Sequence, residues 1–148
     1  MRPDQVENLN RKIVSAAFMD HLPRGAPVGI IIKSGREIPP LYELFPYCHI
    51  RRLDPLQIAS QGISEPLKRA IVRGSLGSLN PELRLSTLIR LHESLEEGGH
   101  LAIAERVHRD SFPTQGYFFR LAQQAGFKDV WFREAPSGTV ILTAYKSP

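Results

Sequence analysis

Lys33, Asp54 and Arg73 each stand at the carboxyl end of a short apolar or alternating run, where their side chains could bind a ligand. Open α/β sheets bind ligands at the carboxyl ends of their strands. A lysine there can hold an anion, and an arginine can hold a carboxylate or phosphate through paired hydrogen bonds. The alternatives are a solvated loop lysine, a surface salt bridge and, for Asp54 before Pro55, a turn or helix cap.

The candidates for acid–base or nucleophilic chemistry are few. Glu105, Arg106 and His108 follow another strand-like run, and His108 is a candidate general base. His92 lies on the apolar stripe of a predicted helix, which favours a packed histidine. The single cysteine, Cys48, is expected to be a small buried hydrophobe. Because the sequence has no zinc-site spacing, no Gly-x-Ser-x-Gly elbow and no Walker loop, we assign no metal and no catalytic residue.

The composition indicates one soluble globular domain over residues 1–148. Of these residues, 42% are hydrophobic and 23% are charged. No run approaches the roughly 18 apolar residues of a membrane span, and the first residues lack a signal-peptide core, so we expect a cytoplasmic protein. The net charge of +4 comes from dispersed lysines and arginines, which favours solubility over nucleic-acid binding.

The run that organises the chain is 81–105, PELRLSTLIRLHESLEEGGHLAIAE. Helical spacing and Asn80 as the N-cap predict a helix that Gly98-Gly99 ends. The apolar run 100–104 then predicts a buried strand, and a helix followed at once by a strand is half of a βαβ unit. The stripe expected to face the core is Leu85, Leu88, Ile89, His92 and Leu95.

The remaining segments alternate between helical and strand patterns. The predicted helices are 6–21, 41–45, 55–63 and 116–125, and the predicted strands are 28–32, 48–53, 67–73, 128–133 and 139–146. The last two strands are too close in sequence for a crossover and must pair antiparallel. The expected fold class is α/β: a three-layer sandwich whose mostly parallel sheet ends in a C-terminal antiparallel hairpin. An N-terminal helix and loop, 1–24, precede the α/β core, 25–148.

Two stretches resemble class I S-adenosylmethionine-dependent methyltransferases. NPELRLSTLIRLHESLEEGGHLAIAE (80–105) resembles the family's segment from strand four through its helix to strand five. FFRLAQQAGFKDVWFREAPSGTVILTAYK (118–146) resembles its C-terminus and is most similar to that of the quinone-biosynthesis methyltransferases. The resemblance covers residues 28–146 and implies a Rossmann-like sheet in the order 3-2-1-4-5-7-6, with strand seven antiparallel.

The resemblance also implies where a cofactor would bind. Asp54 matches the acidic residue that ends strand two in the family and hydrogen-bonds the cofactor ribose. Counted back without gaps, Gly35 matches the last glycine of the family's D-x-G-x-G-x-G turn, and Arg73 and Gly74 match the segment after strand four that borders the substrate. The candidate residues for binding S-adenosylmethionine are Lys33, Ser34, Gly35, Asp54, Arg73 and Gly74.

The glycine turn departs from the family pattern. The same count places Gly29 at the acidic position, Ile31 at the first glycine and Lys33 at the middle glycine. Glycines there let the backbone approach the methionine part of the cofactor, often with positive φ, which a β-branched side chain strongly disfavours. Lys33 would also place a cation beside the sulfonium. These departures disfavour ordinary binding of S-adenosylmethionine.

The interval between Asp54 and the strand at 67–73 is also short. The family fits a helix, strand three and a second helix into this interval, so we predict that strand three is missing. The sheet would then have six strands in the order 2-1-4-5-7-6. The edge left by the missing strand has backbone groups that can pair with a partner protein or a second copy of the chain.

Two functional hypotheses follow. The first is a methyltransferase-like domain with a degenerate cofactor loop that is non-catalytic and serves as a binding, regulatory or assembly module, with a protein partner or as a homodimer. The second is an active small-molecule S-adenosylmethionine-dependent methyltransferase with a minimal site, where transfer needs little beyond an aligned acceptor. Another small-molecule ligand in the same crevice stays open. Trp131 and Tyr145, on the predicted hairpin, are interpreted as core or interface residues.

Overall fold

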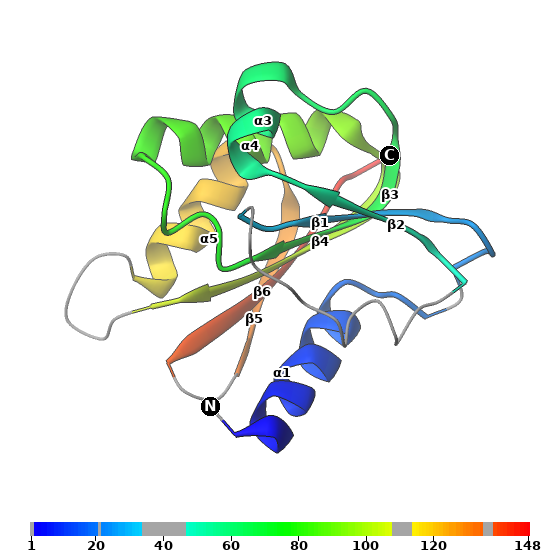
Figure 1. The fold of residues 1–148 in the computed structure, drawn as a ribbon. Helices are drawn as coiled ribbons and strands as arrows, with labels where there is room; N and C mark the ends of the chain where they lie inside the picture. Colours follow the sequence, from blue (N-terminus) through cyan, green and yellow to red (C-terminus); the bar gives the residue numbers. More distant parts are fainter. Residues whose placement is uncertain (1, 21, 34–46, 108–113, 135–137) are drawn as a thin grey trace.

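A computed structural model of the chain describes residues 2–20, 22–33, 47–107, 114–134 and 138–148. In this part of the chain, six strands form one sheet in the order β2-β1-β3-β4-β6-β5 (Figure 1). In chain order the strands are β1 (Pro27–Ile31), β2 (His49–Leu53), β3 (Leu67–Arg73), β4 (Leu95–Arg106), β5 (Lys128–Glu134) and β6 (Thr139–Tyr145). The first four run parallel to one another, and β6 pairs antiparallel with both β4 and β5.

The described helices cover both faces of the sheet (Figure 1). Helix α1 (Pro3–Ala16) lies on one face, and α3 (Pro55–Gln61), α4 (Pro81–Ser94) and α5 (Gln115–Gln124) lie on the other. Strand residues alternate between the layers, so that Ile71 packs with the α1 cluster and Val72 packs with the α4 and α5 cluster. The three-layer α/β fold predicted from the sequence is therefore confirmed.

The interval that the sequence marked as short contains α3 and no strand of its own. Helices α3 and α4 pack directly against each other, and the Thr87 hydroxyl donates to the carbonyl of Pro55 across that contact at 3.4 Å. Strand β2 is consequently an edge strand of the sheet. The observed order matches the predicted 2-1-4-5-7-6, so the prediction that strand three is missing is confirmed.

The C-terminal end of α4 differs from the prediction. The helix ends at Ser94 rather than at Gly98-Gly99, and Leu95 is already extended, with φ −70° and ψ 139°. The Lys146 ammonium donates to the carbonyls of His92 and Leu95 at 2.7 Å each, which satisfies groups that a helix end leaves unpaired. The glycines instead lie in an irregular part of β4, where the pairing with β3 shifts register and Gly98 has a φ of 80°.

The buried face of α4 also differs from the predicted stripe. Leu88 and Leu95 are buried as predicted, but Ile89 is 37% exposed. The helix also turns Arg84, Thr87 and Leu91 toward the core. Asn80 is the N-cap residue as expected but makes no side-chain capping bond.

Several predicted element bounds shift by a few residues. Helix α1 begins at Pro3 and ends at Ala16 instead of spanning 6–21, and the turn after it gives Phe18 a φ of 52°. The predicted helix at 41–45 lies outside the described residues.

Among the helices of the described ranges, none is long and apolar enough to cross a membrane.

Candidate ligand-binding crevice

A cavity of about 380 Å³ opens at the carboxyl ends of β1 and β2, where α3 and α4 begin. We call it the crevice. This is the end of an open α/β sheet at which ligands bind. Its lining residues are Lys33, Asp54, Pro55, Leu56, Ser78, Leu79, Asn80 and Leu83. Two of the candidate residues from the sequence, Lys33 and Asp54, are therefore brought together here.

Asp54 caps helix α3. Its backbone is extended, with φ −85° and ψ 130°, and its Oδ1 accepts a hydrogen bond from the backbone N–H of Leu56 at 2.9 Å. Pro55 follows at the first helical position, where its fixed φ suits a helix start. The capping role weighed from the sequence is therefore present, and the ribose-binding role stays a prediction.

The end of β1 has ordinary backbone geometry where the family has its glycine turn. Ile31 is fully buried, and its carbonyl accepts from the Ser75 hydroxyl at 3.1 Å. Lys33 has an exposed side chain, and its backbone carbonyl accepts a hydrogen bond from Arg52 Nη2 at 3.1 Å. Ile31 and Lys33 are not among the described residues with positive φ, so their side chains cause no strain there.

Gly29 has a packing role in the middle of β1. It pairs with Arg51 on one side and Ala70 on the other. A Cβ atom at this position would lie 2.9 Å from Leu67 Cδ1 and 3.0 Å from Leu53 Cδ1. The position that the count assigned to the family's acidic residue is therefore a closely packed point between strands, where a side chain would require Leu67 and Leu53 to move.

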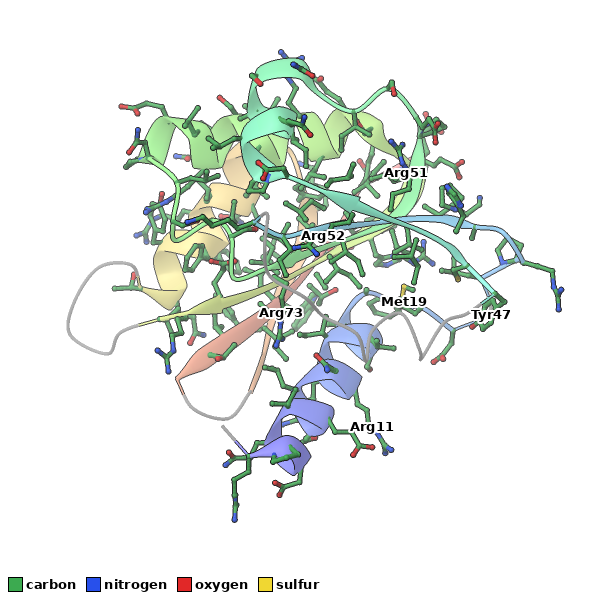
Figure 2. All side chains as sticks on the ribbon, in the orientation of Figure 1. Arg11, Met19, Tyr47, Arg51, Arg52 and Arg73 are labelled. Carbon is green, nitrogen blue, oxygen red and sulfur yellow. The ribbon has the colours of Figure 1, made fainter. Side chains whose placement is uncertain are left out.

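Arg73 and Gly74 are not among the described residues that line the crevice. Arg73 pairs in register with Ala104, whose side chain belongs to the α1 cluster, and Figure 2 shows Arg73 on the α1 side of the sheet. Gly74, with a φ of 60°, donates its N–H to the carbonyl of Ala104 at 2.8 Å and turns the chain out of β3. Ser34, Gly35 and the candidate base His108 lie outside the described residues.

Glu105 is a buried carboxylate whose structural role the sequence did not reveal. It is 2% exposed at the end of β4 and accepts backbone N–H groups from the loop that follows β3. Its Oε2 accepts from Ser75 at 3.0 Å and from Leu76 at 3.4 Å, and its Oε1 accepts from Gly77 at 2.9 Å. Both oxygens are therefore used to hold the loop that leads to the crevice wall.

Arg84 on α4 holds the same loop through its carbonyls. Its Nε donates to Leu76 at 2.8 Å and its Nη2 donates to Gly77 at 3.2 Å. Its guanidinium also lies 5.6 Å from the ring centre of Tyr117. Burial raises the pKa of Glu105 to about 7, although the three N–H donors and the Arg84 charge favour its ionised form.

The remaining sequence predictions concern single side chains. The ring of His92 packs edge-on against Phe127, with 4.9 Å between centroids, and burial is the main cause of its lowered pKa, so the packed histidine is confirmed. Cys48 is half-buried rather than fully buried. Trp131 is 66% exposed, so a place in the core is wrong for it and an interface role stays a prediction.

Comparison with known proteins shows what the chain resembles. No model of a known protein family matches the sequence, and no curated protein matches it. Solved structures do match. PigF with SAH has a TM-score of 0.65 at 13% identity, over 97% of this chain and 59% of that one. Human N-acetylserotonin methyltransferase in complex with SAM has a TM-score of 0.67 at 15% identity, over 94% of this chain and 52% of that one.

A third solved structure is matched over most of its length. Burkholderia thailandensis 1,6-didemethyltoxoflavin-N1-methyltransferase has a TM-score of 0.64 at 20% identity, over 96% of this chain and 80% of that one. The chain has the fold of class I S-adenosylmethionine-dependent methyltransferases, with one strand fewer. At these identities the likeness shows the fold alone. The chain also spans little more than half the length of the first two structures, and its likeness to the quinone-biosynthesis type stays a prediction.

Proposed function

We propose that this chain is a methyltransferase-like module with a degenerate cofactor loop that has lost catalysis and acts by binding. The observation that carries the proposal is the state of the cofactor end of β1. The buried Ile31 accepts a hydrogen bond from the Ser75 hydroxyl through its carbonyl. Two residues later comes the cationic Lys33. A cofactor that needs a close backbone approach at this point meets the buried Ile31 and the exposed, cationic Lys33 instead of glycines.

The charge at the crevice opposes a sulfonium ligand. Lys33 and Arg52 are joined at the end of β1, and the N-terminus of the 14-residue helix α4 adds a partial positive charge beside Asn80. The Asp54 carboxylate offsets part of this, but one of its oxygens already caps α3.

The described residues near the crevice also supply no obvious general base. Glu105 has its pKa raised to about 7, which suits proton transfer. Both of its oxygens, however, accept from backbone N–H groups of the loop at Ser75 to Gly77, so the carboxylate faces the protein rather than a substrate. We therefore assign it a structural role.

An active small-molecule methyltransferase is the alternative. Two observations favour it: Asp54 lines the crevice at the end of β2, and solved structures of the same fold contain SAM or SAH. Methyl transfer to a well-placed acceptor needs alignment more than it needs a base.

Titration calorimetry with S-adenosylmethionine and with S-adenosylhomocysteine separates the two functions. We expect no binding heat from the natural sequence. The informative variant is Asp54→Asn, because asparagine is as good an N-cap as aspartate and changes only the charge. Micromolar binding that Asp54→Asn weakens would overturn the proposal. A Lys33→Gly variant tests the blocking lysine: it should gain affinity if an otherwise intact site lies beneath it.

We also infer that the module assembles through the outer edge of β2, which no other strand of the described residues pairs with. His49 donates its N–H to the carbonyl of Ala26 beside β1 at 2.9 Å, so by strand alternation the N–H of Arg52 points away from the sheet. Arg52→Pro would remove that outward donor without removing a bond to β1, and Arg52→Ala is its matched control. Light scattering should show a dimer for Arg52→Ala and a monomer for Arg52→Pro. A natural chain that stays monomeric at high concentration contradicts the homodimer.

A further inference from the structure

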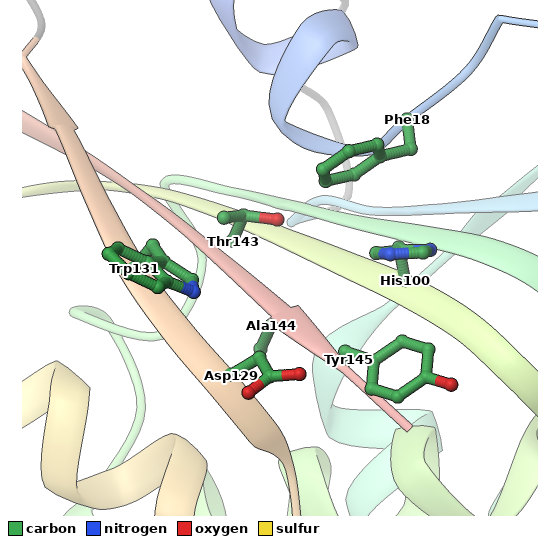
Figure 3. A pocket seen from close by; sticks show the side chains of 7 residues that line it. All are labelled: Phe18, His100, Asp129, Trp131, Thr143, Ala144 and Tyr145. Carbon is green, nitrogen blue, oxygen red and sulfur yellow. The ribbon is translucent and has the colours of Figure 1, made fainter. Parts of the chain in front are cut away.

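A second cavity, of about 470 Å³, lies on the α1 face of the sheet (Figure 3). We call it the aromatic pocket. Thr143 marks the face, because its hydroxyl donates to the carbonyl of Ala16 at the end of α1. Side chains from β4, β5, β6 and the turn after α1 meet there. The lining residues are Phe18, His100, Asp129, Trp131, Thr143, Ala144 and Tyr145.

Backbone strain converges on this pocket. In the part of the chain that the structure describes, the non-glycine residues with positive φ are Phe18, at 52°, and Asp129, at 49°. Both line the pocket, although they are far apart in sequence. A left-handed backbone costs a residue such as phenylalanine about 1–2 kcal/mol and costs an aspartate less, and such strain tends to persist where function needs a side chain in one place. Phe18 is further held by Arg69, whose Nε donates to its carbonyl at 2.9 Å.

A β-bulge places Asp129. The ladder pairs Lys128 with Tyr145 and next pairs Trp131 with Thr143, so three steps along β5 oppose two along β6. Such a bulge bends the strand and changes the direction of a side chain. Figure 3 shows the result, with the Asp129 carboxylate between the side chains of Trp131 and Tyr145.

The pocket has a wall of aromatic rings. The ring centroids of Phe18 and His100 are 4.3 Å apart, and those of His100 and Tyr145 are 5.2 Å apart. Trp131 at the rim is 66% exposed and Phe18 is 44% exposed, which leaves large π-surfaces open to a ligand. Large exposed apolar groups gathered in one place mark binding sites more often than isolated ones do.

The described lining residues of the pocket include an aspartate and no lysine or arginine. Asp129 is the carboxylate among the lining residues. Burial and the nearby Arg69 lower the pKa of His100, so its ring is neutral at neutral pH. The Arg69 guanidinium is not a lining group, and two of its nitrogens donate to the carbonyls of Phe18 and Lys68. A carboxylate set among aromatic faces is the chemistry that recognises alkylated ammonium groups.

We propose that the aromatic pocket binds an organic cation with an alkylated ammonium head. The head lies over the Asp129 carboxylate and against the rings of Trp131 and Tyr145, and the attached apolar body fills the space toward Phe18. A volume of about 470 Å³ is within the range of small-molecule sites. The pocket is on the opposite face of the sheet from the packed α3 and α4, so the proposal is independent of whether the crevice binds a cofactor.

Trp131 is the only tryptophan of the chain, so intrinsic fluorescence reports on the pocket directly. The probe is choline, and its control is 3,3-dimethylbutan-1-ol, which has the same shape without the charge. Choline should change the fluorescence saturably and the neutral alcohol should not. Asp129→Asn should weaken choline binding by about tenfold, which corresponds to about 1.4 kcal/mol. The matched control is Asp4→Asn, an exposed aspartate on α1 that should leave the affinity unchanged.

Two further variants keep the test sharp. Asp129→Gly removes the carboxylate and also suits the positive φ, so a folded protein that no longer binds choline supports the proposal. Phe18→Gly does the same at the other strained position and should weaken binding while preserving the fold. An absent choline response, equal binding of the neutral alcohol, or unchanged affinity in Asp129→Gly would each overturn the proposal. A protein that binds N-acetyl-argininamide but does not bind choline would also overturn it, and would indicate that the pocket receives an arginine of a partner protein.

Discussion

The crevice and the aromatic pocket are cavities of similar size, about 380 and 470 Å³, built in opposite ways. In the crevice, Asp54 caps a helix and the backbone at Ile31 and Lys33 is ordinary. In the aromatic pocket, Phe18 and Asp129 have a backbone with positive φ, and the ring of Trp131 is exposed to solvent.

The difference teaches where this fold uses its polar groups. Around the crevice they hold the structure together, so their loss should cost stability. At the aromatic pocket, Phe18 and Asp129 have an unfavourable backbone conformation, so changing these two residues should cost binding while stability is preserved or rises. The likeness to methyltransferases alone would place the binding site in the crevice, whereas the positive φ of Phe18 and Asp129 favours a site on the opposite face of the sheet.

The largest effect is expected for Arg84→Ala. The change leaves the carbonyls of Leu76 and Gly77 without their donors and leaves the buried Glu105 without its nearby cation. We expect a loss of about 3–5 kcal/mol in the free energy of unfolding, measured by urea denaturation. Arg90→Ala is the control, since Arg90 is exposed on the same helix and should change stability by less than about 0.5 kcal/mol. Similar losses in both variants would contradict the structural role of the crevice wall.

The pH dependence of stability should report Glu105. Its pKa is about 7 in the folded chain and near 4.5 when unfolded, so between these values the unfolded state loses the proton first. Glu105 therefore adds stability that is fully present below pH 4.5 and is lost as pH rises through 7, by about 3 kcal/mol in total. Denaturation curves from pH 4 to 8 measure this slope. Glu105→Gln should flatten it, and an equal slope in that variant would show that another group is responsible.

A smaller effect is expected at Asp54. Asp54→Ala removes the cap bond to Leu56 and should lower the free energy of unfolding by about 1 kcal/mol, whereas Asp54→Asn should lower it by only a few tenths. The two thermal midpoints are compared directly. Equal destabilisation by both changes would mean that the charge, rather than the cap, is what the fold needs.

The smallest effect has the opposite sign. Asp129→Gly should raise the free energy of unfolding by about 0.5 kcal/mol, because glycine adopts positive φ without strain and the gain exceeds the added freedom of the unfolded chain. Asp20→Gly, at an aspartate that is not among the residues with positive φ, should destabilise and serves as the control. If Asp129→Gly destabilises as Asp20→Gly does, the contrast between the two cavities fails.

The sheet could be predicted from the sequence because its signals are local. β-branched runs, a short interval after Asp54 and a two-strand C-terminal pattern were enough to fix the strand order and the missing strand. The end of α4 could not be predicted, since the group that completes it is Lys146, more than 50 residues away. Gly98-Gly99 is a strong local stop signal, but here a distant side chain ends the helix first.

The candidate sites were harder to predict. Lys33 and Asp54 meet as strand ends should, because neighbouring parallel strands bring their carboxyl ends together. Arg73 did not join them, since the one-residue alternation of β3 sends it to the other face. The positive φ of Phe18 and Asp129 could not be predicted, because neither position has the glycine that usually marks such a conformation. The role of Glu105 could not be predicted either, because its three N–H donors come from a loop 28 to 30 residues away.

The pairing of β4 with β6 has a consequence for how the chain is made. Strand β4 is central in the finished sheet, yet one of its long sides is covered only by a strand synthesised more than 30 residues later. Until that strand leaves the ribosome, the nascent chain displays an open strand edge beside a helix whose last carbonyls still await Lys146. Ribosome-bound intermediates of this protein are therefore where chaperones should be needed most.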